Sequence, residues 1–458
     1  MSSSDFKARP NTSSFMFKNT EIFQTRDGQN SVNFRTLTWP IVAVLFLKIQ
    51  FSTGVLSIPT AMHTLGAVGG SLSIISWCAW TQYTAIIMGD FRAKHGGCHS
   101  IADLAEVVGG RILKEAIGLL FIFANVLCAG SAIIATSTAL NALSLHAACT
   151  VWWALIAATL IAFCASIRKL ENLTFLTWAG FASVFSAVLI VVIAVTIPDR
   201  PAAAPQRGPF ELGFHAFPVP APSFAEGMVA SCTIFVSSSN TGAFIPVISE
   251  MKSPKDYNKA VYTSMTTLTV LYFVFGLVVY RYCGQWVASP SLGSAGQTIK
   301  MISYGVGLLG LIVTGCLYTH IGAKYAFVRI LRNSRHLQDN TIIHWTTWLG
   351  CTFSIVAVGF VLAEAIPIFN YLLALLGAIV FGPVAIIFPA YLWLYDHGHY
   401  RCNSLRKKVI YAFHAFFIPF GLFITVAGTY AVCLQIKDAY ATGQISSVFS
   451  CADNSNST

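Results

Sequence analysis

Two short motifs interrupt long apolar segments of this chain. Thr53-Gly54 is followed by Pro59, and Thr241-Gly242 is followed by Pro246, in matching positions of two halves of the sequence. Backbone N–H and C=O groups that lose their partners inside hydrocarbon cost several kcal/mol each, so a helix breaks at membrane depth only where it lines a cavity or holds a ligand. Two such breaks in corresponding helices indicate the binding site of a transporter.

Each break exposes backbone groups of one polarity. The half-helix that restarts toward Pro59 presents N–H groups of Thr53, Gly54 and Val55 at the positive end of its dipole, which suits a carboxylate. The polar run from Ser237 to Gly242 competes with helix formation, and its freed carbonyl groups could receive an ammonium group. A zwitterion that spans both breaks is satisfied at both ends, so an α-amino acid is the simplest ligand.

Close packing of small residues between helices is the alternative interpretation of these motifs. Asn125, in a third apolar segment, could bind substrate or form a hydrogen bond between helices, and Glu364 and Asn370 are equally ambiguous. The candidate substrate-binding residues are Ser52, Thr53, Gly54, Val55, Asn125, Ser237, Ser238, Ser239, Asn240, Thr241 and Gly242.

The composition is that of an integral membrane protein. Of 458 residues, 55% are hydrophobic and 10% are charged, and the mean hydropathy is +0.67. No charged residue occurs in 49–89, 116–167 or 365–395, and a membrane-spanning helix needs about 20 residues. We predict eleven spans, near residues 37–64, 68–90, 115–144, 150–167, 174–197, 224–248, 258–281, 299–328, 343–364, 367–394 and 408–434.

The basic residues predict the orientation of these spans. With the N-terminus inside, 22 of the 28 Lys and Arg residues fall in inner segments and five in outer ones, with Lys48 left inside a span. This asymmetry satisfies the positive-inside rule and places the C-terminus outside. It also explains the net charge of +10 without nucleic acid, and makes acidic phospholipid the expected neighbour of the inner face.

The segments outside the spans offer no soluble catalytic domain. Residues 1–35 are polar and predict a disordered cytoplasmic tail, while the outer loop 198–223 carries seven prolines and predicts an irregular cap. A short helix at the membrane surface is expected after His95-Gly96-Gly97, and residues 435–458 form an outer tail. Cys149, Cys283 and Cys451 lie near the outer face, where any pair of them could form a disulfide.

The motifs around the breaks carry a family resemblance. Ser52-Thr53-Gly54-Val55-Leu56-Ser57-Ile58-Pro59 resembles the first span break of the amino acid/auxin permease family, and Ile248 to Lys255 resembles the segment that leaves its sixth span. With Tyr318 to Tyr325, the chain is most similar to the fungal neutral amino acid permeases of that family, from about Phe34 to Gln435.

This resemblance implies a particular all-α architecture. It consists of two inverted five-helix repeats, at residues 36–197 and 224–394, followed by an eleventh helix at 408–434. Helices 1 and 6 are broken, and substrate is held between spans 1, 3, 6 and 8. The family usually has Gly where Ser52 stands, and often an aromatic residue, Gly and His where this chain has its Ser/Asn run, which puts side-chain selectivity in question.

The resemblance also suggests how transport is driven. Lys48 falls where sodium-coupled members tend to have a neutral sodium ligand, and His320 falls near a hydroxyl ligand of the same ion. A tethered ammonium would fill that cation site, so we expect coupling to protons, with Lys48 or His320 as the titrating group. Lys324 is a further coupling candidate, although packing or lipid contact also explains it.

We therefore expect a secondary active transporter that imports neutral amino acids by proton symport and alternating access. Sodium coupling, exchange and an amino acid-sensing receptor with the same fold remain open. Neither an enzyme nor a cofactor is expected, because no metal-ligand spacing or nucleophile–base set occurs. We place the protein in the plasma membrane, with the vacuolar membrane as the alternative. The sequence does not predict an oligomeric state.

Overall fold

Helices form all the regular structure that the computed structural model describes, apart from one isolated bridge between Leu37 and Met251. The described residues are 37–51, 53–167, 170–331, 334–337, 341–443 and 447–455. The predicted tail 1–35 and the candidate residue Ser52 lie outside them. The predicted all-helical class is confirmed for the described residues.

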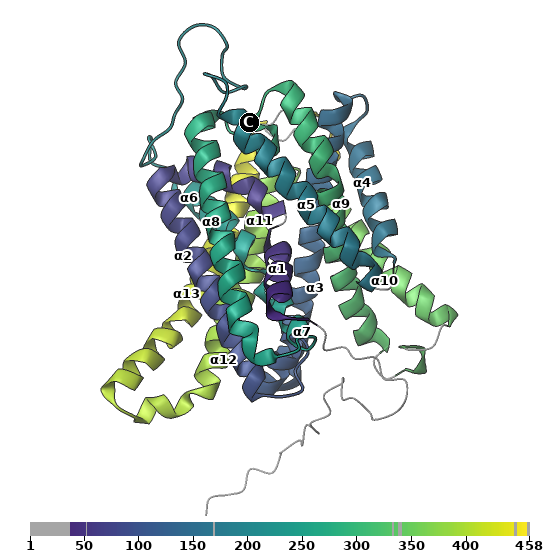
Figure 1. Ribbon diagram of the computed structural model, residues 1–458, viewed down its shortest axis with the longest axis vertical. Coiled ribbons are helices and arrows are strands. Elements are labelled where there is room, and N and C mark those ends of the chain that lie inside the picture. Colours follow the sequence, from purple (N-terminus) through teal and green to yellow (C-terminus); the bar gives the residue numbers. More distant parts are fainter. Residues whose placement is uncertain are drawn as a thin grey trace, which may run out of the picture.

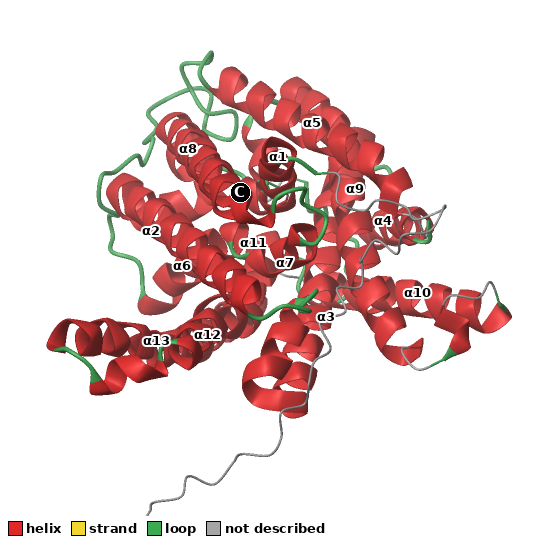
Figure 2. Ribbon diagram, turned by 60° about the horizontal axis from the view of Figure 1, so that its bottom comes forward, coloured by secondary structure: helices red, strands yellow, loops and turns green. Residues whose placement is uncertain are grey.

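The first half of the chain contains the first break and five helices (Figure 1). They are α1 (Trp39–Gln50), the 3-10 turn η1 (Thr53–Ser57), α2 (Ile58–Lys94), α3 (Ile101–Ser144), α4 (Thr150–Ala165) and α5 (Leu170–Val195). Figure 2 shows α1 enclosed by α5, α8 and α9.

The second half repeats this pattern of a broken helix followed by long ones. Its elements are α6 (Phe224–Ser238), the 3-10 turn η2 (Asn240–Ala243), α7 (Phe244–Ile248), α8 (Tyr257–Cys283), α9 (Gln297–Leu331), α10 (Ile342–Ala365), α11 (Phe369–Leu375), the π-helical segment η7 (Leu376–Ile387), α12 (Phe388–Asp396) and α13 (Leu405–Ala441).

Each predicted span overlaps a helix of the structure. Nine continuous or merged helices in the described residues are long and apolar enough to cross a membrane, and the two shorter apolar helices are α1 and α4. The count of eleven crossings remains a prediction.

Local sequence explains where several helices begin and bend. Ser100 and Asp103 form a capping box at the start of α3, and Ser223 and Glu226 form one at the start of α6. Gly110 has a positive φ of 63°, which L side chains rarely adopt, and it bends α3 after its first turns. This separates a short initial helix, as the sequence predicts, from the long remainder.

Different segments cover the two ends of the molecule. The loop 198–223 and the C-terminus lie at one end in Figure 1, and α7 lies toward the other. There, the N–H of Leu37 donates to the Glu250 carbonyl (3.1 Å), the N–H of Lys252 donates to the Leu37 carbonyl (2.8 Å), and the rings of Phe46 and Phe244 stack at 3.9 Å. These contacts join the start of α1 to α7.

A disulfide fixes the C-terminal tail at the opposite end. Cys149, between α3 and α4, pairs with Cys451, whereas Cys283 is a buried free thiol. The sequence left this choice of partners open.

The predicted cap, loop 198–223, is irregular and rests on a corner within α2, between its first two turns and its long remainder. Gly66 forms this corner with a φ of 75°, and the N–H groups of Ala67 and Val68 donate to the carbonyls of His215 (3.0 Å) and Ala216 (2.9 Å). A Cβ on Gly66 would lie 2.8 Å from the Ala216 oxygen. The corner therefore needs glycine both for its backbone conformation and for the approach of the loop.

We expect Gly66→Ala to lower the melting temperature of the detergent-purified protein more than Gly110→Ala does. Both glycines have a positive φ, but a Cβ on Gly110 would meet nothing within 4 Å. The combination of a positive φ with an extended ψ, which is essentially restricted to Gly, costs each variant about 1–3 kcal/mol, and overpacking adds about 1–3 kcal/mol at residue 66 alone. Equal losses for the two variants would show that the loop does not hold this corner.

Candidate functional site

The two helix breaks lie against each other in the structure. The Ser237 hydroxyl donates to the Gly54 carbonyl (3.0 Å), and the Gln50 amide donates to the Ser238 carbonyl (2.9 Å). A Cβ on Gly54 would lie 2.8 Å from the Ser237 oxygen and 3.0 Å from its Cα. Gly54 thus lets the break after α1 approach the end of α6.

Side-chain donors satisfy the carbonyl groups that the breaks set free. The Tyr272 hydroxyl of α8 lies 2.9 Å from the carbonyl oxygens of both Gln50 and Ser237, one in each break. The Tyr318 hydroxyl of α9 lies 3.3 Å from the Ile49 carbonyl, and the Ser57 hydroxyl donates to that of Gly54 (2.7 Å). The carbonyls of Ser237 and Ser238, which we expected to receive an ammonium group, already accept one hydrogen bond each.

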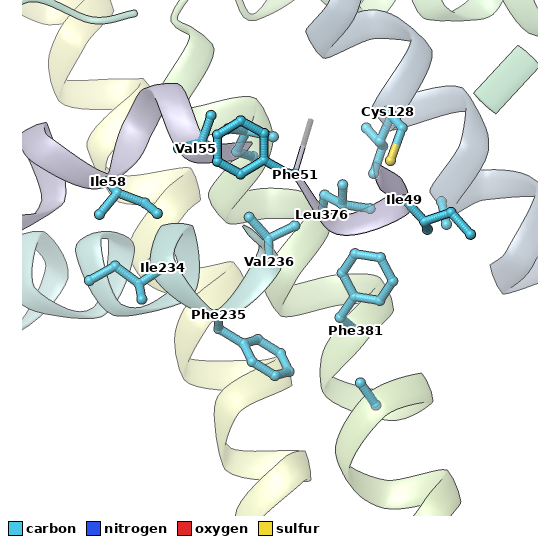
Figure 3. Packing of buried hydrophobic residues seen from close by; sticks show 14 of the residues in the cluster. Ile49, Phe51, Val55, Ile58, Cys128, Ile234, Phe235, Val236, Leu376 and Phe381 are labelled. Carbon is cyan, nitrogen blue, oxygen red and sulfur yellow. The ribbon is translucent and has the colours of Figure 1, made fainter. Parts of the chain in front are cut away.

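A small cavity of about 20 Å³ lies between the breaks, about the space of one water molecule. Figure 3 shows apolar side chains of α3, α6 and η7 close to the α1 break, among them Cys128, Val236, Leu376 and Phe381. The lining residues are Gln50, Thr53, Gly54, Cys128, Ser131, Val236, Ser237, Asn240, Tyr318, Leu373, Leu376 and Phe381. Among these described residues none carries a charge.

A larger cavity of about 550 Å³ opens toward the end that carries the C-terminus, within the size range of small-molecule sites. Three residues of its wall, Ile134 on α3, Thr233 on α6 and Asn370 on α11, stand about one helical turn from Ser131, Ser237 and Leu373 of the small cavity. The floor of the large cavity therefore lies directly beside the breaks. We call the two spaces the outer cavity and the central cavity.

The structure brings only part of the predicted substrate set to the central cavity. Thr53, Gly54, Ser237 and Asn240 line it, and their role in substrate binding stays a prediction. The remaining described members do not, and these are Val55, Asn125, Ser238, Ser239, Thr241 and Gly242.

The reasons for this division are local. The hydroxyls of Ser238 and Ser239 bond to the Phe235 carbonyl one turn back in α6. A Cβ on Gly242 would lie 3.0 Å from the Ile101 side chain at the start of α3. The Asn125 amide donates to the Phe121 carbonyl of its own helix (2.7 Å).

Lys48 lies in a second cavity of about 20 Å³ between α1, α5 and α9. The side chain is 5% exposed, and its ammonium stands 4.2 Å from the centre of the Trp178 ring, a cation–π contact. Within the described residues no carboxylate lies within ion-pair distance of it. Tyr318 lines both this cavity and the central one, and so forms the partition between them.

His320 points to a different side of α9. Its Nδ1 lies 3.4 Å from the Ala165 carbonyl at the end of α4, and its ring meets Trp348 of α10 edge-on at 5.1 Å. Residues 318 and 320 are two positions apart, which on a helix separates their side chains by about 200°. The structure therefore does not bring His320 and Lys48 together.

Lys324 is exposed near the end of α9 that faces away from the C-terminus. Its charge acts on Glu250, just after α7: desolvation raises the pKa of this carboxyl, and Lys324 opposes that rise. Ser249, the neighbour of Glu250, accepts from the Arg92 guanidinium (2.8 Å). Lys324 lines neither the central cavity nor the cavity of Lys48.

Sequence reasoning missed Gln50, Tyr272 and Tyr318 as parts of the site. Gln50 is a polar residue in an otherwise apolar run, and that signal was available. Tyr318 stands in the motif that supports the family resemblance, but nothing in its spacing pointed to the Ile49 carbonyl. Tyr272 carried no signal, because it is one of 16 tyrosines and its partners are backbone atoms.

Two broken helices that meet at a buried cavity define a membrane transporter of the broken-helix class. The family model for transmembrane amino acid transporter proteins matches residues 35–434, and the chain belongs to this family. The resemblance read from the sequence is thereby confirmed.

The relatives agree with this assignment, and a solved structure shares the fold. The chain is 46% identical to a "transmembrane transporter" of Gibberella moniliformis, over 95% of this chain and 91% of that one. It is 28% identical to an "N amino acid transport system protein" of Neurospora crassa, over 93% and 90%. The fold is similar to that of Mhp1, a nucleobase-cation-symport-1 family transporter, with 14% identity, a TM-score of 0.53 and coverage of 93% and 98%.

We expect Tyr272→Phe to lower the melting temperature of the purified protein. Loss of the hydroxyl leaves the carbonyls of Gln50 and Ser237 without this buried donor, which costs about 1–3 kcal/mol. Tyr262→Phe, an exposed position on the same helix, is the matched control and should change little. Equal stability of both variants would show that the hydroxyl bridge does not hold the breaks together.

Proposed function

We propose that this protein is a secondary active transporter that imports neutral amino acids by proton symport, and that it catalyses no reaction. The observation that carries the substrate class is the lining of the central cavity, which combines two helix breaks with apolar side chains and, among the described residues, no charge. A substrate side chain with a net charge would find no counter-ion there, and burying it would be costly.

The amino acid head group fits the two breaks in one orientation. The first N–H groups of a helix have no partner within it, so those of Thr53, Gly54 and Val55 suit the carboxylate. For the ammonium group we propose the side-chain oxygens of Ser131 and Asn240, together with the second lone pairs of the α6 carbonyls. Val236, Leu376 and Phe381 then remain for the substrate side chain.

Alternating access follows from the asymmetry between the two ends. The outer cavity reaches the breaks from the C-terminal side, while the Leu37–Met251 bridge and the Phe46–Phe244 stack close the other side. Since the central cavity is smaller than an amino acid, binding must widen it. We propose that the outer cavity faces the cell exterior, with the N-terminus in the cytoplasm and the protein in the plasma membrane.

Proton coupling is proposed to act through Lys48. Its ammonium lies in a cavity between α1, α5 and α9, beside the carbonyl end of α1 that suits a cation. Tyr318 connects this cavity to the central one and bonds to the Ile49 carbonyl next to Lys48. Protonation or deprotonation of Lys48 would thus affect the substrate site through the Tyr318 hydroxyl and the last turn of α1.

Proteoliposomes containing the purified protein should concentrate neutral amino acids when an inward proton gradient is imposed. Lys48→Ala should lose concentrative uptake while exchange persists, and Lys437→Ala, an exposed position on α13, should transport normally. If His320→Ala lost the pH dependence of uptake and Lys48→Ala only transported more slowly, His320 would be the titrating group instead of Lys48. Accumulation on a sodium gradient at symmetrical pH would overturn proton coupling, and binding without any accumulation would indicate a sensor.

Gly54→Val should abolish uptake with surface expression largely intact, because its side chain covers the N–H groups proposed for the carboxylate. Gly69→Ala is the control, since its Cβ would make an ordinary 3.6 Å contact. The double variant Gly54→Ala/Ser237→Gly separates packing from binding. Of the three Ser237 atoms that a Cβ at residue 54 would meet, it removes Oγ and Cβ and leaves only the backbone Cα. Recovery of uptake in this double variant would assign Gly54 to helix packing alone.

A further inference from the structure

The C-terminal tail returns over the outer cavity and is bonded to its rim. Cys451 is joined to Cys149 by the disulfide, and the next residue, Ala452, accepts a hydrogen bond through its carbonyl from the Thr150 hydroxyl (2.6 Å). Cys149 and Thr150 lie at the junction of α3 and α4, so this junction is the anchor of the tail.

Asn454 extends the attachment along α3. Its side-chain oxygen accepts from the Asn141 amide (2.8 Å), and its own amide donates to the Ser137 hydroxyl (3.3 Å). The Asn141 amide also donates to the Thr150 hydroxyl (2.7 Å), which closes a network of side chains beneath the tail. Ser455, the last described residue, is 8% exposed. Residues 447–449, 451 and 452 are exposed, so the tail is held at particular residues, namely Cys451, Ala452, Asn454 and Ser455, and is not packed along its whole length.

The tail also forms one wall of the outer cavity. Its contribution consists of Ser447, Ser450, Ala452, Asp453 and Asn454. On other elements, the lining includes Thr60 and Thr64 of α2, Glu226 of α6, and Glu364 and Asn370 near the junction of α10 and α11. A solute that enters through the outer cavity therefore passes between the tail and these helices.

We propose that the C-terminal tail is a size-selecting wall of the outer cavity, held in place by the Cys149–Cys451 disulfide and by Asn454. It limits the bulk of the solute that can enter, and its position depends on an oxidising exterior. The claim that the tail selects substrates rests on the transport function proposed above. The claim that it limits access to the outer cavity does not depend on that function.

A structural staple is the other reading of the same bonds. A disulfide that closes a long loop stabilises the folded state whatever lies beneath it. The two readings differ in one measurable respect. A staple changes stability without regard to the size of a reagent that enters the cavity, whereas a wall discriminates by size.

The experiment measures access to a cysteine placed on the opposite wall, Thr64→Cys, in protein purified in detergent. Two methanethiosulfonate reagents are compared, one with a small ethylammonium group and one with a bulky biotin group, and mass spectrometry of the peptide that contains residue 64 gives each rate. The disulfide-free background is Cys149→Ser/Cys451→Ser. Asn454→Ala keeps the disulfide and removes the hydrogen bonds, and Cys433→Ser, an exposed thiol on α13, is the matched control.

Without the disulfide, the bulky reagent should react about tenfold faster, equivalent to about 1.4 kcal/mol, and the small one should change much less. Asn454→Ala should give a smaller shift in the same direction, and Cys433→Ser none. Treatment of the folded protein with a phosphine, which is removed before labelling, should reproduce the effect of the double serine variant and so separates access from misfolding. Equal rate changes for both reagents, or none, would overturn the proposal.

A transport readout then tests the link to substrate selection. In proteoliposomes, the ratio of tryptophan to alanine uptake should rise in the disulfide-free variant. If this uptake ratio were unchanged while the bulky reagent reacted faster, the tail would limit access to the outer cavity without selecting substrates. Absence of uptake in wild-type protein would refute the proposed function and leave the labelling result intact.

Discussion

The need to pair backbone groups inside an apolar core controls the centre of this structure. Where α1 and α6 stop, each leaves carbonyl groups without a helical partner, and leaving them unpaired in apolar surroundings is costly. Gln50, Ser237 and Tyr272 supply the missing donors, and each bridges the two breaks. The breaks are therefore bound to each other, and the position of α8 is fixed by the same bonds, because Tyr272 belongs to it.

This pairing explains why the central cavity is small without a ligand and how it can communicate with its surroundings. The donors occupy part of the polar surface that a zwitterion would use, so substrate must share these carbonyls or displace donors from them. Tyr318 adds the cavity of Lys48 to the same system, since its hydroxyl bonds to α1 and the residue lines both cavities. The side chain of Tyr318 can therefore couple the position of the substrate to the protonation state of Lys48.

Much of the fold was predictable because hydrophobic length, charge-free runs and the positions of glycine, proline and small polar residues are local signals. They placed the spans, both breaks, a short helix after His95-Gly96-Gly97 and the irregular loop, whereas the bend at Gly110 came from the structure. The direction of side chains was not predictable, since it depends on how each helix is rotated in the bundle. This is why Ser238 and Ser239 fall outside the central cavity while Ser237 lies in it, and why His320 faces α4 although Tyr318 faces α1. The choice of Cys149 and Cys451 as partners required knowing where the tail folds back.

The π-helical segment η7 determines which of its side chains reach the central cavity. Leu376 and Phe381 both line that cavity although they are five positions apart. In an α-helix five residues turn the chain by about 500°, which would point the second side chain about 140° away from the first. In a π-helix the hydrogen bonds join residues five apart, and the two side chains fall on one face. The wider turns of the π-helix therefore bring the ring of Phe381 to the same face as Leu376, beside the breaks. If this segment were wound as an α-helix, Phe381 would leave the cavity and α12 would be rotated relative to α11.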